Sequence, residues 1–442
     1  MASMKLAQLI DPVDPINVPK TNGTVDVTSE HSMSGPQNGS ATLPFRGGNR
    51  TNSLNRRGKV RFFVLDTSEM TSQLVEVQQQ KAHNFYHTNA LNEEKIEVWL
   101  HRAYLYMSED EGRTTDPNDA DVFMIPYYGH LRAETKPLPN TTRFAEELVN
   151  RLYDVSKPHL LLCPSNNPKR SRTAGIGELV GTLRNAGVNL WSVGLERNPS
   201  WQSLPPERIV PVPYLVKPSL PKEARINSTR IAKIEDSVFY VGDQRPNAVR
   251  WGGCNRSMVK PLEDSPNMFV RITHSKHQRI DQEEYNRRMQ SSDFCLVLCG
   301  DTPTSRSLAS SVVNGCIPIR VGSRLRGLCR KPCRRGFGWR VTGPDNPHLP
   351  YTDVIPWQEF PEVNEAKFAR NPQVVLNETI SKFDAESKAT LREMLYTHGE
   401  GWIYGFGNPI KSEDFGEAAH YILNSFVSTL KLRQHLSITN PR

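Results

Sequence analysis

The chain has 442 residues, more than a single ordinary hydrophobic core accommodates, so two domains are expected. Its content of 37% hydrophobic and 23% charged residues fits a globular protein and excludes a fibrous or membrane-embedded class. The formal net charge of +8 is matched by segment 320–340 alone, which holds seven Arg, one Lys and no Asp or Glu, so the rest of the chain is balanced.

The first 58 residues differ in composition from the rest. Residues 11–58 are rich in Pro, Gly, Ser, Thr and Asn, so we expect a disordered tail or stalk over 1–58. Residues 1–10 hold only a short apolar patch and make a poor signal peptide. No stretch approaches the roughly 18 apolar residues of a spanning helix. A stalk of this kind fits a membrane anchor located upstream, which this sequence does not show.

Strands and helices alternate over the first half of the chain. Strands are expected at 60–65, 121–126, 159–163, 188–193 and 209–212, and helices at 71–107, 142–153 and 175–187. The strands are continuous apolar runs, which is typical of a parallel sheet covered on both faces. We therefore predict a Rossmann-like domain over 59–225.

The alternation repeats after a proline-rich and charged linker at 214–236. Strands are expected at 237–241, 268–272, 294–298 and 316–321, and helices at 281–290, 305–314, 366–369 and 380–398. These predict a second Rossmann-like domain over 237–410, followed by a C-terminal segment at 411–442 with a helix at 413–434. The predicted fold class is α/β, with two such domains. Ligands are expected beyond the carboxyl ends of the parallel strands.

Cysteines and glycosylation sequons bear on the compartment. The seven cysteines include two pairs with CxxxC spacing, Cys295/Cys299 and Cys329/Cys333. Both pairs together could bind zinc, the second pair could close a disulfide loop, and the first could be buried thiols. Seven Asn-X-Ser/Thr sequons exceed the roughly four that chance would give, which favours a secretory-pathway lumen.

The basic segment 320–340 has two interpretations. A charge run is commonly a solvated face. It could instead bind an anion such as a phosphate, an acidic glycan or a nucleic acid. Aromatic side chains that would stack on bases are few in it, namely Phe337 and Trp339, so nucleic acid is the weakest of these ligands.

Residues 294–319 carry the densest chemical signal. A buried strand leads into Gly300-Asp301 and then into a helix start with the capping types Thr304 and Ser305. The free N–H groups of a helix N-terminus suit a diphosphate. Arg306 lies in the first turn, where it opposes the helix dipole, and this placement favours an anion facing it. The alternative is an ordinary βαβ unit with a surface arginine.

This stretch resembles the exostosin family of glycosyltransferases. The matching residues are Phe294-Cys295-Leu296, Gly300-Asp301, Thr304-Ser305-Arg306 and Gly315-Cys316-Ile317-Pro318. Upstream, the block from Arg113 to Tyr128 resembles the family's Arg-Thr-x-Asp-Pro-x-x-Ala-Asp-x-Phe-x-x-Pro-x-Tyr pattern. The resemblance extends over roughly residues 60–430.

The resemblance implies a GT-B architecture, with two Rossmann-like domains facing across a cleft. It implies an inverting transfer of a sugar from a nucleotide sugar, UDP-linked, to a glycan or glycoprotein acceptor, without a cofactor or metal, in the Golgi lumen. The acceptor could be acidic, and no nucleic acid partner is expected. The donor-binding residues would be Gly242, Arg245, Arg256, Gly300, Asp301, Ser305, Arg306, Ser307 and Ser310. Asp119 and Asp121 have Asp-X-Asp spacing but precede a strand, so we expect no metal there.

One departure from the family pattern concerns Ser310. The family places an acidic residue there, expected to hold ribose hydroxyls, and serine lacks the charge-assisted strength. A catalytically inactive, glycan-binding or scaffolding relative is therefore the alternative function. Inversion also needs a general base, for which Asp66 and His130 are candidates because each follows a strand of the N-terminal domain.

Overall fold

The computed structural model describes residues 59–67, 94–129, 141–164, 175–195, 204–216, 233–243, 256–273, 280–298, 306–322, 349–405 and 415–439. Within these ranges the chain forms two parallel five-stranded sheets flanked by helices, so the predicted α/β class is confirmed. Within the same ranges, no helix is long and apolar enough to cross a membrane.

The first sheet keeps its strands in chain order. They are β1 (Phe62–Val64), β2 (Val122–Pro126), β3 (His159–Leu162), β4 (Leu190–Gly194) and β5 (Ile209–Pro211). All pairings are parallel, as their continuous apolar runs predict. All five predicted strands of this half are therefore confirmed.

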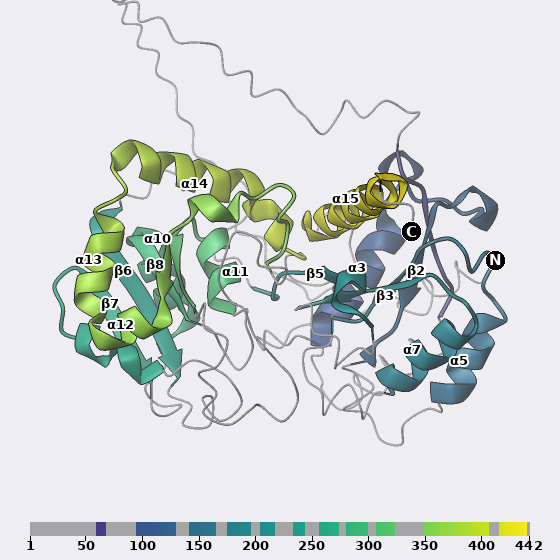
Figure 1. Cartoon of the computed structure of the whole chain (residues 1–442), viewed down its shortest axis with the longest axis horizontal. Coiled ribbons are helices and arrows are strands. Elements are labelled where there is room, and N and C mark those ends of the chain that lie inside the picture. Colours follow the sequence, from purple (N-terminus) through teal and green to yellow (C-terminus); the bar gives the residue numbers. More distant parts are fainter. Residues whose placement is uncertain are drawn as a thin grey trace, which may run out of the picture. The chain divides into compact units, whose positions relative to one another are not determined.

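Helices cover both faces of this sheet. Alternate residues of each strand point to opposite sides, so the apolar strands present an apolar surface on each face. Val122 and Met124 of β2 belong to the hydrophobic cluster that includes side chains of α3 (Glu94–Tyr106). Phe123 and Ile125 belong to the other cluster, with side chains of α5 (Thr141–Val149) and α7 (Ile176–Asn185). Figure 1 shows α5 and α7 next to each other.

The second sheet reverses its strand order once. Its order is β10-β9-β8-β6-β7, where the strands are β6 (Ile234–Asp243), β7 (Met268–Thr273), β8 (Ser292–Leu298), β9 (Ile317–Gly322) and β10 (Glu362–Asn364). The chain runs from β6 out to β7 and returns to the other side of β6 to form β8. The topological switch point of this sheet therefore lies between β6 and β8.

Among the described residues, five helices accompany the second sheet, and a polar N-cap separates two of them. Its helices are α10 (Gln282–Ser291), α11 (Arg306–Val313), α12 (Glu365–Arg370), α13 (Pro372–Ile380) and α14 (Ala385–Gly399). The prediction of one helix over 380–398 was wrong at its start. The side chain of Asp384 accepts a hydrogen bond from the Ser387 amide and begins α14, while α13 ends at Ile380. The three-residue strand β10 was not predicted.

Short 3-10 helices complete the described structure, at Glu109–Glu111 (η2), Pro117–Asp119 (η3), Pro206–Arg208 (η4), Arg256–Leu262 (η7), Trp357–Glu359 (η9) and Glu400–Trp402 (η10).

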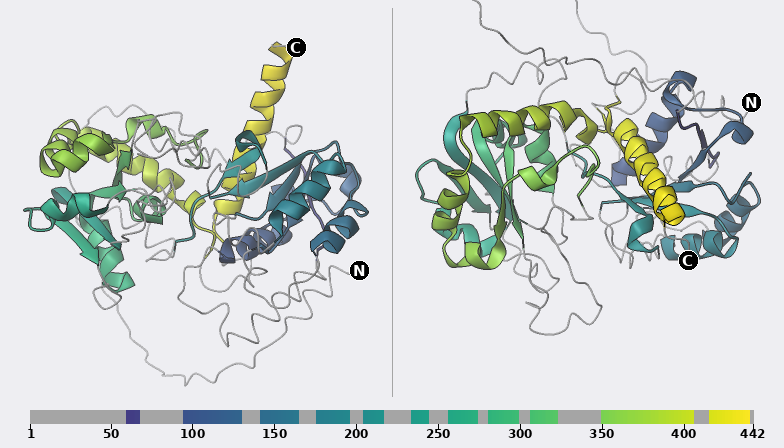
Figure 2. Two further views of the ribbon diagram at one scale, coloured as in Figure 1. Left: turned by 60° about the horizontal axis from the view of Figure 1, so that its bottom comes forward. Right: turned by 45° about the horizontal axis from the view of Figure 1, so that its top comes forward.

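The last helix, α15 (Ala418–Thr439), packs against elements of the first sheet. The Tyr104 hydroxyl on α3 donates to the Ala419 carbonyl over 2.9 Å. The rings of Trp191 on β4 and Phe426 are 5.4 Å apart, edge to face. Figure 2 shows α15 running alongside this part of the chain. The C-terminal helix therefore completes the core of the N-terminal sheet.

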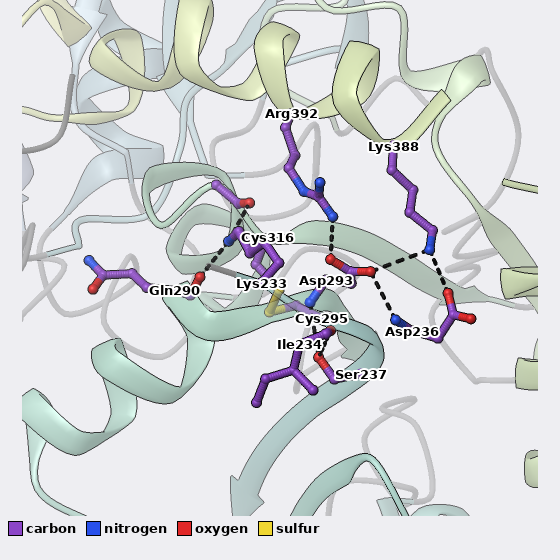
Figure 3. A network of polar contacts seen from close by, with 11 residues as sticks. Lys233, Ile234, Asp236, Ser237, Gln290, Asp293, Cys295, Cys316, Lys388 and Arg392 are labelled. Carbon is purple, nitrogen blue, oxygen red and sulfur yellow. Dashed lines mark hydrogen bonds and ion pairs between the residues drawn. A yellow bond between two sulfur atoms is a disulfide. The ribbon is translucent and has the colours of Figure 1, made fainter. Parts of the chain in front are cut away.

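A buried charge network closes the amino-terminal edge of the second sheet (Figure 3). Asp293, near the start of β8, accepts hydrogen bonds from Arg392, from Lys388 over 3.4 Å and from the Asp236 amide over 2.9 Å. Lys388 also reaches Asp236 over 2.5 Å. Because this edge lies opposite the carboxyl ends of the strands, we assign the network to stability.

A disulfide joins Cys295 on β8 to Cys316 just before β9 (Figure 3). The interpretations of Cys295 as a buried thiol and as a zinc ligand were therefore wrong, because its sulfur is bonded to that of Cys316. The pairing follows from β8 and β9 lying side by side in the sheet, which the CxxxC spacing does not reveal. Cys299, Cys329 and Cys333 lie outside the described residues.

Candidate active site

The switch point of the second sheet is one candidate site. β6 and β8 are neighbours, and their carboxyl ends point to the same edge (Figure 1). The chain leaves β8 at Leu298 and enters α11 at Arg306. Arg306 is exposed on the first turn of this eight-residue helix. The next described element after this switch-point strand is therefore a helix that begins with an arginine.

Tyr285 of α10 joins α11 through side-chain hydrogen bonds to Ser310 and Ser307. Burial raises the pKa of Tyr285 to about 12, although these bonds and the charge of Arg306 act to lower it. Ser310 is 9% exposed. Its hydroxyl thus already has a protein partner, which sequence reasoning did not anticipate.

Gly242 lies near the end of β6, opposite Ile272 of β7. A Cβ atom built there would lie 2.3 Å from the hydroxyl oxygen of Tyr240, a buried residue of the same strand. The packing of Tyr240 therefore requires glycine here, independently of any ligand.

Of the remaining residues predicted to bind the donor, the structure describes Arg256 and not the other four. Arg256 begins η7, ahead of β7, and is half-buried. Arg245, Gly300, Asp301 and Ser305 lie outside the described residues.

The basic segment begins with a structural arginine. Arg320 of β9 is 4% exposed, donates to the Trp357 carbonyl over 2.7 Å and lies 3.4 Å from Glu362. It is therefore engaged inside the protein and does not belong to an exposed anion site. The rest of the segment, 323–340, lies outside the described residues.

The carboxyl edge of the first sheet is a second candidate site. Asp66 and Thr67 follow β1, and Tyr127 and Tyr128 follow β2, so the parallel strands bring them to one edge. Asp66 is exposed, whereas Thr67 and Tyr128 are buried. His130, the other base candidate, lies outside the described residues.

His101 of α3 reaches this edge. Its Nδ1 lies 2.8 Å from the Tyr128 hydroxyl, and the two rings meet edge to face at 5.7 Å. Burial, together with the charge of Arg102, lowers the pKa of His101 to about 3, although the charge of Asp66 acts to raise it. The sequence analysis missed His101. The available signal was its position four residues after Glu97, on the same face of the helix.

The Arg113–Tyr128 block serves both edges of the first sheet. At the amino end of β2, Asp121 accepts a hydrogen bond from the Arg61 amide over 2.8 Å, and Asp119 lies 3.3 Å from the Arg61 guanidinium. These contacts tie the chain before β1 to the start of β2, so both carboxylates have a structural role. At the other end of the block, Tyr128 contacts His101.

Comparison with known protein families gives a match over most of the chain. The Exostosin GT47 domain matches residues 56–377, well over half of the sequence. A structural match was also found to the crystal structure of Arabidopsis thaliana UGT89C1 complexed with quercetin. That match has 12% identity and a TM-score of 0.27, and covers 84% of this chain and 92% of the other. A TM-score this low does not define a shared arrangement.

Curated relatives from Arabidopsis thaliana match at low identity. "Probable arabinosyltransferase ARAD1" is 22% identical and the match covers 66% of this chain and 61% of the relative. "Probable xyloglucan galactosyltransferase GT15" is 25% identical, with 52% and 50% covered. "Probable glucuronoxylan glucuronosyltransferase IRX7" is 24% identical, with 52% and 54% covered. The chain thus spans between 50% and 61% of the length of these relatives.

Proposed function

Because the chain belongs to the exostosin GT47 family, we propose that it is a glycosyltransferase that moves a sugar from a nucleotide sugar to a glycan acceptor. The observation that carries this proposal is that α11, which begins at Arg306, is the next described element after β8, at the switch point of the second sheet. Helix N–H groups and a guanidinium together suit the diphosphate of such a donor.

The relatives narrow the class of sugar. Their names specify arabinosyl, galactosyl and glucuronosyl transfer, all onto polysaccharides where an acceptor is named. A UDP-linked pentose, hexose or uronic acid is therefore the proposed donor, and a plant-type cell-wall glycan is the proposed acceptor class. A GT-B arrangement with inversion at the anomeric carbon completes the proposal.

A secretory compartment, the Golgi lumen, is the proposed location. The Cys295–Cys316 disulfide supports it, because disulfides persist in oxidising compartments and are rare in the cytosol. The excess of glycosylation sequons supports the same location.

A panel of UDP-sugars tests the function. Binding to the folded state alone should raise the thermal unfolding midpoint, with a stabilisation of about 2.7 kcal/mol at a ligand concentration of 100 Kd. We expect UDP-arabinose, UDP-galactose or UDP-glucuronate to give the largest rise and to support transfer onto oligosaccharides. Absence of a rise for every nucleotide sugar, together with absence of transfer, would contradict the proposal.

The catalytically inactive alternative is favoured by one observation, the hydrogen bond between Ser310 and Tyr285. This hydrogen bond occupies the hydroxyl of Ser310, the residue that stands where the family has an acidic side chain. Binding of a nucleotide sugar without hydrolysis or transfer of the sugar would support this alternative.

A further inference from the structure

We propose that His101 is the general base of this transferase, positioned by Tyr128 and assisted by Asp66; the inference rests on the proposed function. Neither the family match nor the sequence motifs assign a role to His101.

The place in the fold comes first. Asp66, Tyr128 and His101 come from three different elements, namely the end of β1, the end of β2 and helix α3. They meet at the carboxyl edge of a parallel sheet, where ligands bind in open α/β folds. Tyr128 is the last residue of the Arg113–Tyr128 block. Asp119 and Asp121, within the block, contact Arg61 ahead of β1, whereas Tyr128 forms a hydrogen bond with His101.

The hydrogen bond is compatible with the tautomer that a base requires. Among the described residues, the contact between Nδ1 and the Tyr128 hydroxyl is the one hydrogen bond of the imidazole. In the tautomer that carries its proton on Nδ1, His101 donates to the Tyr128 oxygen. Nε2 then carries the lone pair, and this tautomer is the one a base requires.

The surrounding charges keep the ring neutral before reaction. His101 is 4% exposed, and burial, with the charge of Arg102 on the same helix, disfavours the imidazolium. The titratable groups nearby are Asp66 after β1, Glu97 and Arg102 on α3, and Tyr128 after β2. The charge of Asp66 raises the pKa of His101, whereas burial lowers it. Asp66 would therefore stabilise the imidazolium that forms when His101 accepts a proton.

Two other buried or half-buried histidines show that a hydrogen bond alone does not distinguish His101. Nδ1 of His159 lies 2.8 Å from the Lys157 carbonyl, at the amino end of β3. Nδ1 of His398 on α14 lies 3.3 Å from the Tyr421 hydroxyl. His101 differs from both because it lies at the carboxyl edge of a sheet, with an exposed carboxylate beside it.

The proposed step balances as a single displacement. The acceptor hydroxyl oxygen forms a bond to the anomeric carbon of the donor sugar, and its O–H bond breaks, with the proton passing to Nε2 of His101. The bond from the anomeric carbon to the diphosphate oxygen breaks, and the electron pair leaves with the nucleoside diphosphate. The imidazolium then returns its proton to solvent.

The primary test is His101→Gln, assayed with the UDP-sugar that the wild-type chain uses. General base catalysis contributes about 100- to 10,000-fold. We therefore expect kcat to fall at least 100-fold, while the midpoint shift with the UDP-sugar is retained. The matched control His398→Gln removes the other His–Tyr pair and should keep kcat within about threefold. Undiminished kcat in folded His101→Gln would overturn the proposal.

Two milder variants keep the test decisive if His101→Gln does not fold. Tyr128→Phe retains the ring but loses the acceptor for the Nδ1 proton, and Asp66→Asn changes an exposed side chain. Each should lower kcat about tenfold or more with little change in the acceptor KM, since each acts on proton transfer. Wild-type kcat in both variants would overturn the proposal, whereas an inactive wild-type chain would overturn the proposed function itself.

Discussion

At the scale of single residues, the structure changes the interpretation of Ser310. The sequence assigns this position to the donor ribose, but the hydroxyl forms a hydrogen bond with Tyr285 and is largely buried. A serine placed in this way links α10 to α11, and its hydroxyl already has a protein partner.

Ser310→Ala tests this interpretation. We expect a loss of about 1 kcal/mol in the free energy of unfolding, because the Tyr285 hydroxyl loses a partner. The KM for the nucleotide sugar should change less than threefold. Denaturant unfolding and donor titration measure the two quantities. A tenfold rise in KM with unchanged stability would return Ser310 to the donor site.

Buried histidine also makes stability depend on pH. The pKa of His101 is about 3 in the folded chain against an ordinary value of 6.5. Below pH 6.5 the unfolded chain binds a proton that the folded chain does not, so stability falls as the pH falls towards 3. His159 and His398 also have lowered pKa values and act in the same direction.

The expected size follows from this linkage. Between pH 7 and 5.5, His101 alone should cost about 1 kcal/mol of unfolding free energy. His101→Gln should therefore lose less stability over that interval than the wild-type chain does, as measured by urea unfolding at both pH values. Equal losses in the two proteins would show that the pKa of His101 is not lowered in the folded chain.

At the scale of elements, most of the fold was predictable and the reasons for the misses are local. Nine predicted strands are present because each is a continuous apolar run bounded by turn residues. β10 was not predicted because its sequence, Glu-Val-Asn, has no apolar pattern. It is an edge strand that pairs with β9. The break between α13 and α14 depends on the Asp384 cap, a signal that helical periodicity over 380–398 obscures.

The candidate site was less predictable than the fold. The sequence placed Arg306 in the first helical turn after a buried strand, but it did not indicate that His101 would meet Tyr128. These residues are 27 positions apart and lie on different elements, so only the parallel pairing of β1 with β2 and the packing of α3 bring them together. The Cys295–Cys316 pairing likewise depends on strand order.

The charge network at the start of β8 belongs to the same scale. Asp293 is almost fully buried between Lys388 and Arg392. Burial lowers the pKa of Lys388, but its hydrogen bond to Asp236 and the charges of Asp293 and Asp236 raise it overall. The network therefore joins α14 to the amino edge of the second sheet through charged groups on both sides.

Asp293→Asn should be strongly destabilising, because it leaves the buried Lys388 and the half-buried Arg392 with one charged partner fewer. Breaking a buried pair costs about 3–5 kcal/mol. The control Glu147→Gln breaks the exposed pair with Arg143 and should cost less than about 1 kcal/mol. Denaturant midpoints would compare them, and similar losses in both variants would show that the network adds little stability.

At the scale of the whole molecule, the C-terminal helix returns to the N-terminal sheet. Phe426 packs on Trp191, and the Tyr104 hydroxyl binds the Ala419 carbonyl, 315 positions away in sequence. The Tyr404 hydroxyl donates to the Pro213 carbonyl over 2.8 Å, another link between distant segments. The amphipathic pattern of 413–434 predicted the helix, but it did not identify the surface that the helix covers.

The account as a whole depends on a donor site at the carboxyl edge of β6 and β8. The most direct measurement is sugar transfer by Arg306→Ala, compared with Arg143→Ala, which alters an exposed arginine on α5. We predict that Arg306→Ala loses more than 100-fold in kcat/KM, keeps its unfolding midpoint without ligand and no longer gains stability from the nucleotide sugar, whereas Arg143→Ala behaves as the wild-type chain. Full transfer by Arg306→Ala would contradict the placement of the donor at this edge.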